Sequence, residues 1–277
     1  MSRLLDRFTD GQIMAMLVQR DFSAINNVFE DDEITVFGRG LYNYVNPDLT
    51  LRFPNLTHVN PYAFYNVNVK LEINFEKLEF IGDHGFYYFK GTGMPEHLKL
   101  TNAVTLQENA FMYAPTIVTL EAPAIVDVYM PAYLFSCIST LTKVKCQNLE
   151  RPGQLMFFMD ANLIEADLPS FRESMNPIFN NCTKLETVRL GGYTIGSLAG
   201  LFTQNCSQVK TIILDHISNI PAIGDLKILP KMTDGTCKVY VPRDMVTTLR
   251  AADNWKDYAG QILAIEDHPE VMPTWDD

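Results

Sequence analysis

A phenylalanine recurs along most of this chain at a nearly constant interval, and this spacing constrains the fold more than any other feature. The intervals between successive members are 22, 25, 24, 23, 21 and 23 residues. The phenylalanines are Phe64, Phe86, Phe111, Phe135, Phe158, Phe179 and Phe202. A fixed period of roughly 20 to 50 residues is the sequence signature of stacked structural repeats. We therefore predict a solenoid in which these rings lie above one another inside the coils.

Each unit also carries two apolar residues that are separated by a single residue. These pairs are Leu51/Phe53, Leu71/Ile73, Leu98/Leu100, Leu120/Ala122, Val144/Cys146, Ala166/Leu168, Val188/Leu190 and Ile212/Leu214. Alternation with a period of two predicts a short strand with one buried face. A period of roughly 20 to 29 residues is typical of leucine-rich repeats. The prediction is a β-rich (α/β) leucine-rich-repeat solenoid of about eight coils of ~23 residues, with one parallel strand in each coil.

The residue between the two apolar residues points outward, and its charge alternates in sign over seven successive coils. In chain order these residues are Arg52, Glu72, Lys99, Glu121, Lys145, Asp167, Arg189 and then Ile213. Opposite charges on neighbouring strands favour the strand register by ~0.2 to 1 kcal/mol each. A ligand surface is one interpretation of this face. We favour the other, a solvated face whose charges neutralise one another and fix the register.

Both ends of the chain depart from the repeat. Residues 1–27 predict a helical N-terminal cap or attachment segment, in which Thr9 and Gln12 fit a capping box. Residues 28–236 form the predicted solenoid. Residues 237–268 predict a C-terminal capping module of strand, helix, turn, short helix and strand, with Trp255 and Tyr258 packed on the last coil. Residues 269–277 form an acidic tail.

Composition and motifs exclude several classes of function. The net charge of −11 argues against a nucleic-acid partner, which needs clustered Lys and Arg. No apolar run approaches the ~18 residues of a membrane-spanning helix, so we expect no membrane insertion. Asp6 and Asp10 fall where a signal peptide needs an unbroken apolar run, which predicts no signal peptide. The sequence has no nucleophile, phosphate-binding or metalloprotease motif, and its His and Cys residues lack zinc spacing. We therefore expect no catalytic residue, no metal, no cofactor and no enzyme activity.

The repeat resembles the BspA-like leucine-rich repeats. The resemblance is clearest in LRFPNL from Leu51 and in YAFYN from Tyr62, and the end of the chain, from YVP at Tyr240 onward, is similar to the closing module of that family. The N-terminal stretch, residues 13–20 leading into Ile34, is similar to versions encoded by bacterial viruses and prophages, often among tail genes. The pattern degrades at residues 147–162 and 215–235. The family has no shared site, so the resemblance implies a fold and transfers no binding residue.

Candidate binding residues come from one irregular coil and from the tail. Phe86 is followed by Tyr87, Tyr88 and Phe89, and then by Lys90. Four successive aromatic residues cannot all point inward, so part of this ring surface should reach solvent, where it suits contacts with sugar or protein. The alternative is that these rings pack on a neighbouring coil or a sister subunit. Trp275, in the acidic tail, is either a partner anchor or part of a docked tail.

The resemblance at both ends, together with the absence of a signal peptide, predicts a non-enzymatic structural or receptor-binding protein of a virion. Such a component of a phage tail, fibre or baseplate is assembled in the host cytoplasm. It recognises a host-surface glycan or protein, or another virion protein, and it forms a homo-oligomer of sister subunits. The alternative is a bacterial cell-associated adhesin or protein-interaction scaffold of the BspA-like type. A carbohydrate-active enzyme stays open as a third hypothesis, which needs two carboxylates within catalytic reach.

Overall fold

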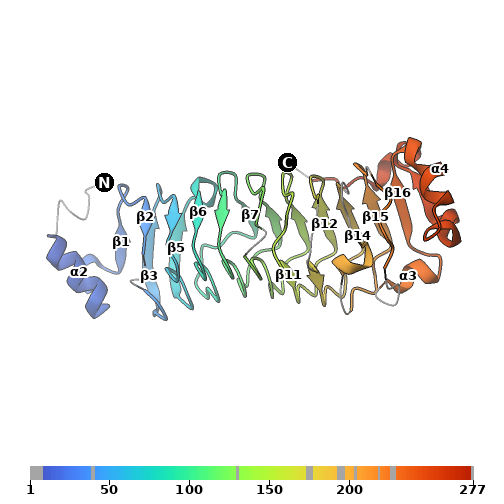
Figure 1. Ribbon diagram of the computed structural model, residues 1–277. Helices are drawn as coiled ribbons and strands as arrows, with labels where there is room; N and C mark the ends of the chain where they lie inside the picture. Colours follow the sequence, from blue (N-terminus) through green and yellow to red (C-terminus); the bar gives the residue numbers. More distant parts are fainter. Residues whose placement is uncertain are drawn as a thin grey trace.

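The coils stack along one axis into an elongated solenoid, with helix α2 at one end and helix α4 at the other (Figure 1). The computed structural model describes residues 9–38, 41–128, 131–172, 177–191, 197–202, 205–217, 219–224 and 229–275. The strands are β1 (Val28–Glu30), β2 (Val36–Phe37), β3 (Val45–Phe53), β4 (His58–Val59), β5 (Asn68–Ile73), β6 (Phe80–Ile81), β7 (His97–Lys99), β8 (Thr105–Leu106), β9 (Thr119–Glu121), β10 (Lys143–Lys145), β11 (Phe157–Phe158), β12 (Glu165–Leu168), β13 (Phe179–Asn180), β14 (Thr187–Leu190), β15 (Thr211–Leu214), β16 (Lys238–Val241) and β17 (Ile262–Ala264). The helices are α2 (Asp10–Gln19), α3 (Pro230–Thr233) and α4 (Arg243–Ala251), and the 3-10 helices are η1 (Ser23–Ile25), η2 (Phe75–Lys77), η3 (Ala199–Leu201), η4 (Lys256–Gln261), η5 (Ile265–Asp267) and η6 (Pro269–Val271).

The main sheet is parallel throughout. Its eight strands follow the order β7-β9-β10-β12-β14-β15-β16-β17, and three further strands follow the order β1-β3-β5. The predicted register is confirmed, because Leu98 pairs with Leu120 and Leu120 pairs with Val144. Apolar side chains therefore lie above one another on the core side, and each coil buries the apolar face of its neighbour.

The expectation of a single strand per coil is incomplete. Strands β2, β4, β6 and β8 form a second parallel sheet, and β11 pairs with β13. Each of these strands has only two residues. Two residues are too short to show period-two alternation, which explains why the sequence pattern does not reveal them.

The charge alternation predicted along the strands is interrupted between β5 and β7. These two strands belong to different sheets, so Glu72 does not pair with Lys99. Thr92 forms an isolated bridge with Lys70 instead. Gly93 has a φ of +100°, and a Cβ there would overlap the carbonyl oxygen of Leu71. Glycine therefore permits the close approach that inserts this segment beside β5.

A continuous stack of phenylalanine rings fills the core, with ring centroids 5.0 to 6.3 Å apart and planes within 18° of parallel. The stack consists of Phe37, Phe64, Phe86, Phe111, Phe135, Phe157, Phe179 and Phe202. The prediction of Phe158 was wrong, because Phe157 is the fully buried member of that pair. Phe158 points to the outside, where its ring meets the edge of Tyr133.

Local signals at both ends are confirmed. Thr9 and Gln12 form the capping box of α2, whose Met16 is buried against the core. After the last repeat come β16, α4, η4 and β17, the predicted order. Trp255 is fully buried, and its indole Nε1 donates to the carbonyl oxygen of Pro221 at 2.7 Å. Within the described ranges, no helix combines the length and the hydropathy that crossing a membrane requires.

The expectation that the outward face of the sheet is solvated was wrong over β12 to β16. Asp167 is 2% exposed, Ile213 is 0% exposed and Tyr240 is 8% exposed. Arg189 forms ion pairs with Asp167 at 3.3 Å and with Asp215 at 2.6 Å. Opposite charges do pair across strands here, but their side chains are sheltered from solvent.

Candidate functional site: an aromatic groove on one edge of the solenoid

One edge of the solenoid carries a row of residues in the left-handed backbone conformation. Their φ angles lie between 50° and 67°. In chain order these residues are Asn43, Asn66, Tyr88, Tyr113, Cys137, Met159, Asn181 and Asn205. In the coils of Asn66 to Met159, a second left-handed residue lies four positions earlier. In the coils from Asn43 to Met159, the backbone N–H of this residue donates to a carbonyl oxygen of the next coil at 2.7 to 3.0 Å. This ladder of hydrogen bonds holds the backbone in a conformation that non-glycine residues rarely adopt.

At both ends of the row the position is occupied by asparagine. Asparagine is one of the few non-glycine residues that tolerate this conformation. The side chains also form amide ladders: Asn66 Nδ2 donates to Asn43 Oδ1 at 2.8 Å, and Asn205 Nδ2 donates to Asn181 Oδ1 at 2.6 Å. Asparagine thus tolerates the left-handed backbone conformation at this edge, and its side chain forms a hydrogen bond with the neighbouring coil.

Four successive coils in the middle of the row depart from asparagine. They place Tyr88, Tyr113, Cys137 and Met159 at the left-handed position. Tyr88 is 43% exposed, Tyr113 is 38% exposed and Met159 is 50% exposed. A left-handed conformation of a residue other than glycine costs of order 1 to 3 kcal/mol, and such strain concentrates at functional sites. Exposed apolar residues held at strained positions therefore mark this stretch as a candidate binding surface.

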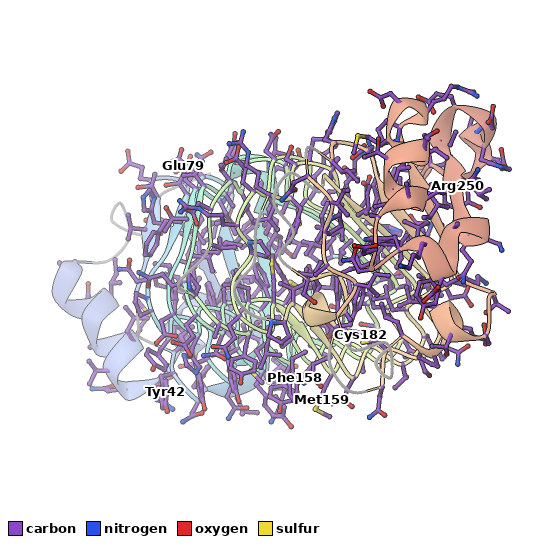
Figure 2. All side chains as sticks on the ribbon, turned by 45° about the vertical axis from the view of Figure 1, so that its right-hand side comes forward. Tyr42, Glu79, Phe158, Met159, Cys182 and Arg250 are labelled. Atoms are coloured by element: carbon purple, nitrogen blue, oxygen red, sulfur yellow. The ribbon has the colours of Figure 1, made fainter. Side chains whose placement is uncertain are left out.

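A groove of about 550 Å³ lies beside the tyrosines of this edge. We call it the aromatic groove, and it is lined by Tyr42, Asn43, Tyr65, Asn66, Tyr87, Tyr88 and Tyr113. The rings of Tyr42, Tyr65 and Tyr87 stack face to face with centroids 4.8 and 4.9 Å apart. Figure 2 shows Tyr42 and Met159 along the same edge of the solenoid, opposite the edge that carries Glu79.

The groove presents neutral hydrogen-bonding groups. Burial raises the pKa of Tyr87, and a hydrogen bond with Cys137 is the main cause of the raised pKa of Tyr113. Because both pKa values move up from 10.0, these phenols stay protonated at neutral pH and can donate hydrogen bonds. Asn66 Oδ1 is buried without a hydrogen-bond partner in the structure.

The structure separates the residues proposed for the irregular coil. Tyr87 and Tyr88 line the groove. The ammonium of Lys90 lies 4.3 Å from the centroid of the Tyr88 ring, a distance suited to a cation–π contact. Phe89 does not belong to the surface: it is fully buried, with its ring edge-on to Phe86. The four aromatic residues therefore divide evenly, because Phe86 and Phe89 enter the core while the two tyrosines reach the edge.

Trp275 is not brought to the groove. Its indole lies 5.5 Å from Lys145 Nζ and 6.0 Å from Lys143 Nζ, on the outward face of β10. The structure thus favours the docked-tail interpretation of this residue.

The sequence analysis missed the rest of the groove, although a signal was present. The residue two positions after a stacked phenylalanine is Asn66, Tyr88, Tyr113, Cys137, Met159 or Asn181 in successive coils. A column that begins and ends in asparagine but is Tyr, Tyr, Cys and Met in between departs from its own repeat. Such a departure is visible only after the phenylalanine of each coil is correctly assigned.

The described part of the chain contains no group of three or more His, Cys, Asp or Glu residues arranged to hold a metal ion. Two carboxylates on β12, Glu165 and Asp167, both face cations. Glu165 lies 3.8 Å from Lys143, and Asp167 lies 3.3 Å from Arg189.

Comparison with known proteins identifies the repeat. The BspA type leucine rich repeat region matches in six copies over residues 21–92, 57–186 and 104–225. These matches run from residue 21 through residue 225 and cover 205 of the 277 residues. The chain belongs to the BspA-type leucine-rich-repeat family.

The parallel sheets and stacked phenylalanines described above are the structural form that this repeat takes here. Among solved structures, the pneumococcal vaccine antigen PcpA is similar to this chain at 12% identity, with a TM-score of 0.29. The alignment covers 86% of this chain and 84% of the PcpA chain. A comparison with curated proteins finds no match.

Proposed function

We propose that this protein is a non-enzymatic recognition protein that binds a partner macromolecule through the aromatic groove and the exposed edge beside it. The observation that carries the proposal is the run of apolar residues at four successive left-handed positions, three of which are at least 38% exposed. Strain of this kind is retained where it serves a function. Membership of the BspA-type family supports a role in protein interaction or adhesion.

The mode of binding is recognition by a preformed surface. The backbone ladder fixes the spacing of the edge residues before a ligand arrives. Tyrosine hydroxyls supply hydrogen bonds, and the exposed ring surface of Tyr88 and Tyr113 supplies contact area. A rigid site of this kind loses little side-chain entropy when it binds.

The setting that we propose is a virion. The motive is the likeness of the N-terminal stretch to versions of this repeat encoded by bacterial viruses, and in this setting α2 attaches the chain to the particle while the coils face the host. The chain then acts as a structural or receptor-binding component of the tail, fibre or baseplate. The cell-associated adhesin or scaffold is the alternative, which the family match supports equally. In either setting, we propose that α2 and the module that contains α4 cap the open ends of the solenoid.

Binding through the groove is tested with a triple variant, Tyr88→Asn, Tyr113→Asn and Met159→Asn, on arrays of immobilised bacterial surface polysaccharides and matrix proteins. The expected result is that the unaltered chain binds at least one surface and that the variant binds it at least tenfold more weakly. A matched control, Val18→Asn, Val104→Asn and Val126→Asn, changes three exposed valines elsewhere and should leave binding unchanged. Equal losses in the two variants, or no binding by the unaltered chain to any surface, would exclude the groove.

The setting is tested separately. Mass spectrometry of purified virions should detect the chain if it is a virion component. An antibody against the chain should label intact, uninfected bacteria if it is a cell-associated adhesin. Detection on the bacterial surface and absence from virions would reject the virion setting and leave the groove proposal standing.

A further inference from the structure

Part of the outward face of the sheet, on β15 and β16, is buried. Ile213 lies between Ile212 and Leu214, which both belong to the core cluster. Successive residues of a strand point to opposite faces, so the Ile213 side chain lies on the outer face of β15. It is nevertheless 0% exposed, and its pairing partner Tyr240 is 8% exposed. The outer side of β15 and β16 is therefore covered at these positions.

The end of the chain, residues 268–275, contacts this face on both sides of β15, and we call it the C-terminal arm. The ring of His268 lies 5.5 Å from the ring of Tyr240 on β16. Trp275, seven residues later, lies over Lys143 and Lys145 on β10. Figure 1 shows the C-terminal end of the chain back over the middle of the solenoid, far from α4.

The dimensions of chain and sheet agree with this path. From β16 the sheet order passes through β15, β14 and β12 to β10. Four strand spacings amount to about 19 Å. Residues 269–271 form the 3-10 helix η6, which rises about 2 Å per residue, so the seven residues reach roughly 19 to 20 Å. The arm is therefore just long enough to cross the intervening strands.

The contacts between the arm and the sheet are specific. The two ammonium groups lie near the indole of Trp275, an arrangement that favours cations over an aromatic ring. The face under the arm is withdrawn from water, since burial is the main cause of the raised pKa values of Glu165 and Asp167.

The fit is also imperfect. Trp275 Nε1 and Glu165 Oε1 are buried without a hydrogen-bond partner in the structure, and Lys143 Nζ lies no closer than 3.8 Å to Glu165 Oε1. Buried polar groups without partners weaken a contact. The arm therefore covers this face without satisfying every polar atom on it.

We propose that the C-terminal arm is exchangeable, so that the face around Lys143, Lys145 and Ile213 also takes the arm of a second copy of this chain. The arm of a second copy would form the same contacts, because the two arms are identical and only the connection after β17 needs to change direction. Exchange of an identical element is a low-cost route to a dimer. A tethered arm has an effective concentration in the millimolar range, so exchange should become appreciable only at high chain concentration.

The first experiment measures binding of a free arm. The chain is shortened after His268, and a fluorescent peptide of residues 264–277 is titrated into it with anisotropy as the readout. We expect saturable binding to the shortened chain and at least tenfold weaker binding to the full chain, whose own arm competes. A Trp275→Ala peptide should bind at least tenfold more weakly.

The matching change in the sheet is the double variant Lys143→Glu with Lys145→Glu. It should weaken binding of the peptide as strongly as Trp275→Ala does. A control, Lys77→Glu with Lys184→Glu, makes the same change in net charge away from β10 and should leave binding unchanged. Circular dichroism establishes that each variant is folded. A folded, shortened chain that does not bind the peptide, or that binds the Trp275→Ala peptide equally well, overturns the proposal.

The second experiment tests exchange between complete chains. Light scattering during size-exclusion chromatography should show a dimer fraction that grows with the concentration of the full chain. The dimer should be absent from the shortened chain and should dissociate when free arm peptide is added. A full chain that stays monomeric up to millimolar concentration, or a dimer that forms equally well without the arm, overturns the proposal.

Discussion

The side-chain amide of Asn66 donates a hydrogen bond to Asn43 Oδ1, one coil away, at 2.8 Å. The same contact recurs between Asn205 and Asn181, at the far end of the same edge. Between these two pairs the amide ladder is replaced by tyrosine, cysteine and methionine in the same backbone conformation. The coils with asparagine at this position can therefore be compared directly with the coils that carry tyrosine, cysteine or methionine there.

Met159→Asn should stabilise the protein. Met159 is half exposed and has a φ of 60°, a conformation that asparagine adopts at lower cost. We expect a gain of about 0.5 to 1 kcal/mol in the free energy of unfolding, measured by urea denaturation. Met159→Ala is the control: it keeps a Cβ and adds no amide, so it should give no gain. Equal effects of the two substitutions would show that the conformation of this residue carries no strain.

Phe157→Ala should destabilise the protein far more than Phe158→Ala. Phe157 is fully buried between Phe135 and Phe179, so its removal leaves a cavity that costs about 3 to 5 kcal/mol. Phe158 lies at the surface against Tyr133, and its loss should cost about 1 kcal/mol. Thermal denaturation of the two variants decides between them. A larger loss of stability in Phe158→Ala would show that Phe158, and not Phe157, belongs to the core stack.

Arg189→Gln should cost more than Arg52→Gln, although both arginines occupy the same position in their strands. The side chain of Arg189 is 19% exposed, and the side chains of its partners Asp167 and Asp215 are 3% and 10% exposed. Removing this cation leaves two sheltered carboxylates without their partner, which should cost about 2 to 4 kcal/mol. Arg52, whose side chain is 37% exposed, pairs with Glu30 and Glu72 near the surface. Its loss should cost at most about 1 kcal/mol.

Urea denaturation of the two arginine variants measures this difference. Raising the salt concentration should reduce the effect of the Arg52 substitution more than that of the Arg189 substitution, because buried charges are screened less. Equal costs and equal salt dependence would indicate that the arm does not shelter the ion pairs of Arg189.

Asp160→Asn should change how stability depends on pH. Asp160 is fully buried, its Oδ1 accepts the Ile138 N–H at 2.7 Å and its Oδ2 has no hydrogen-bond partner in the structure. Burial raises the pKa of this carboxyl well above 3.8. Between 3.8 and the higher folded pKa the native state binds the proton and the unfolded state does not, so stability falls as pH rises through that window.

Asparagine keeps the acceptor for Ile138 and never ionises. The variant should therefore match the unaltered protein near pH 4 and become progressively more stable than it as pH rises. Urea denaturation at several pH values gives both curves. Parallel curves would mean that Asp160 titrates alike in the folded and unfolded states.

The local and periodic features of this fold were predictable from sequence. The alternating pairs predict the pairing of Leu98 with Leu120, and Thr9 with Gln12 predicts the start of α2. Both signals lie within a few residues of the structure that they describe. The assignment of Phe158 to the stack was wrong, because Phe157 and Phe158 are the same residue type and only the stacking of the neighbouring coils distinguishes them.

Two features were not predictable, for different physical reasons. The contact between Trp275 and Lys143 joins residues far apart in the chain and follows no period, so no repeat pattern contains it. The strained conformation of Tyr88 is set by hydrogen bonds of the backbone to neighbouring coils rather than by the side chain. The identity of a residue other than glycine or asparagine gives little indication of a positive φ.

The backbone ladder along the edge has a consequence for how such a protein changes over time. In the coils from Asn43 to Met159, the N–H of the edge residue donates to the next coil whether the residue is asparagine, tyrosine, cysteine or methionine, so the turn persists when the side chain is exchanged. A new specificity can then arise by substitution at one position per coil, without redesign of the scaffold beneath it. The edge therefore offers one substitutable position per coil at a regular spacing, and asparagine is the residue found there where no apolar side chain is present.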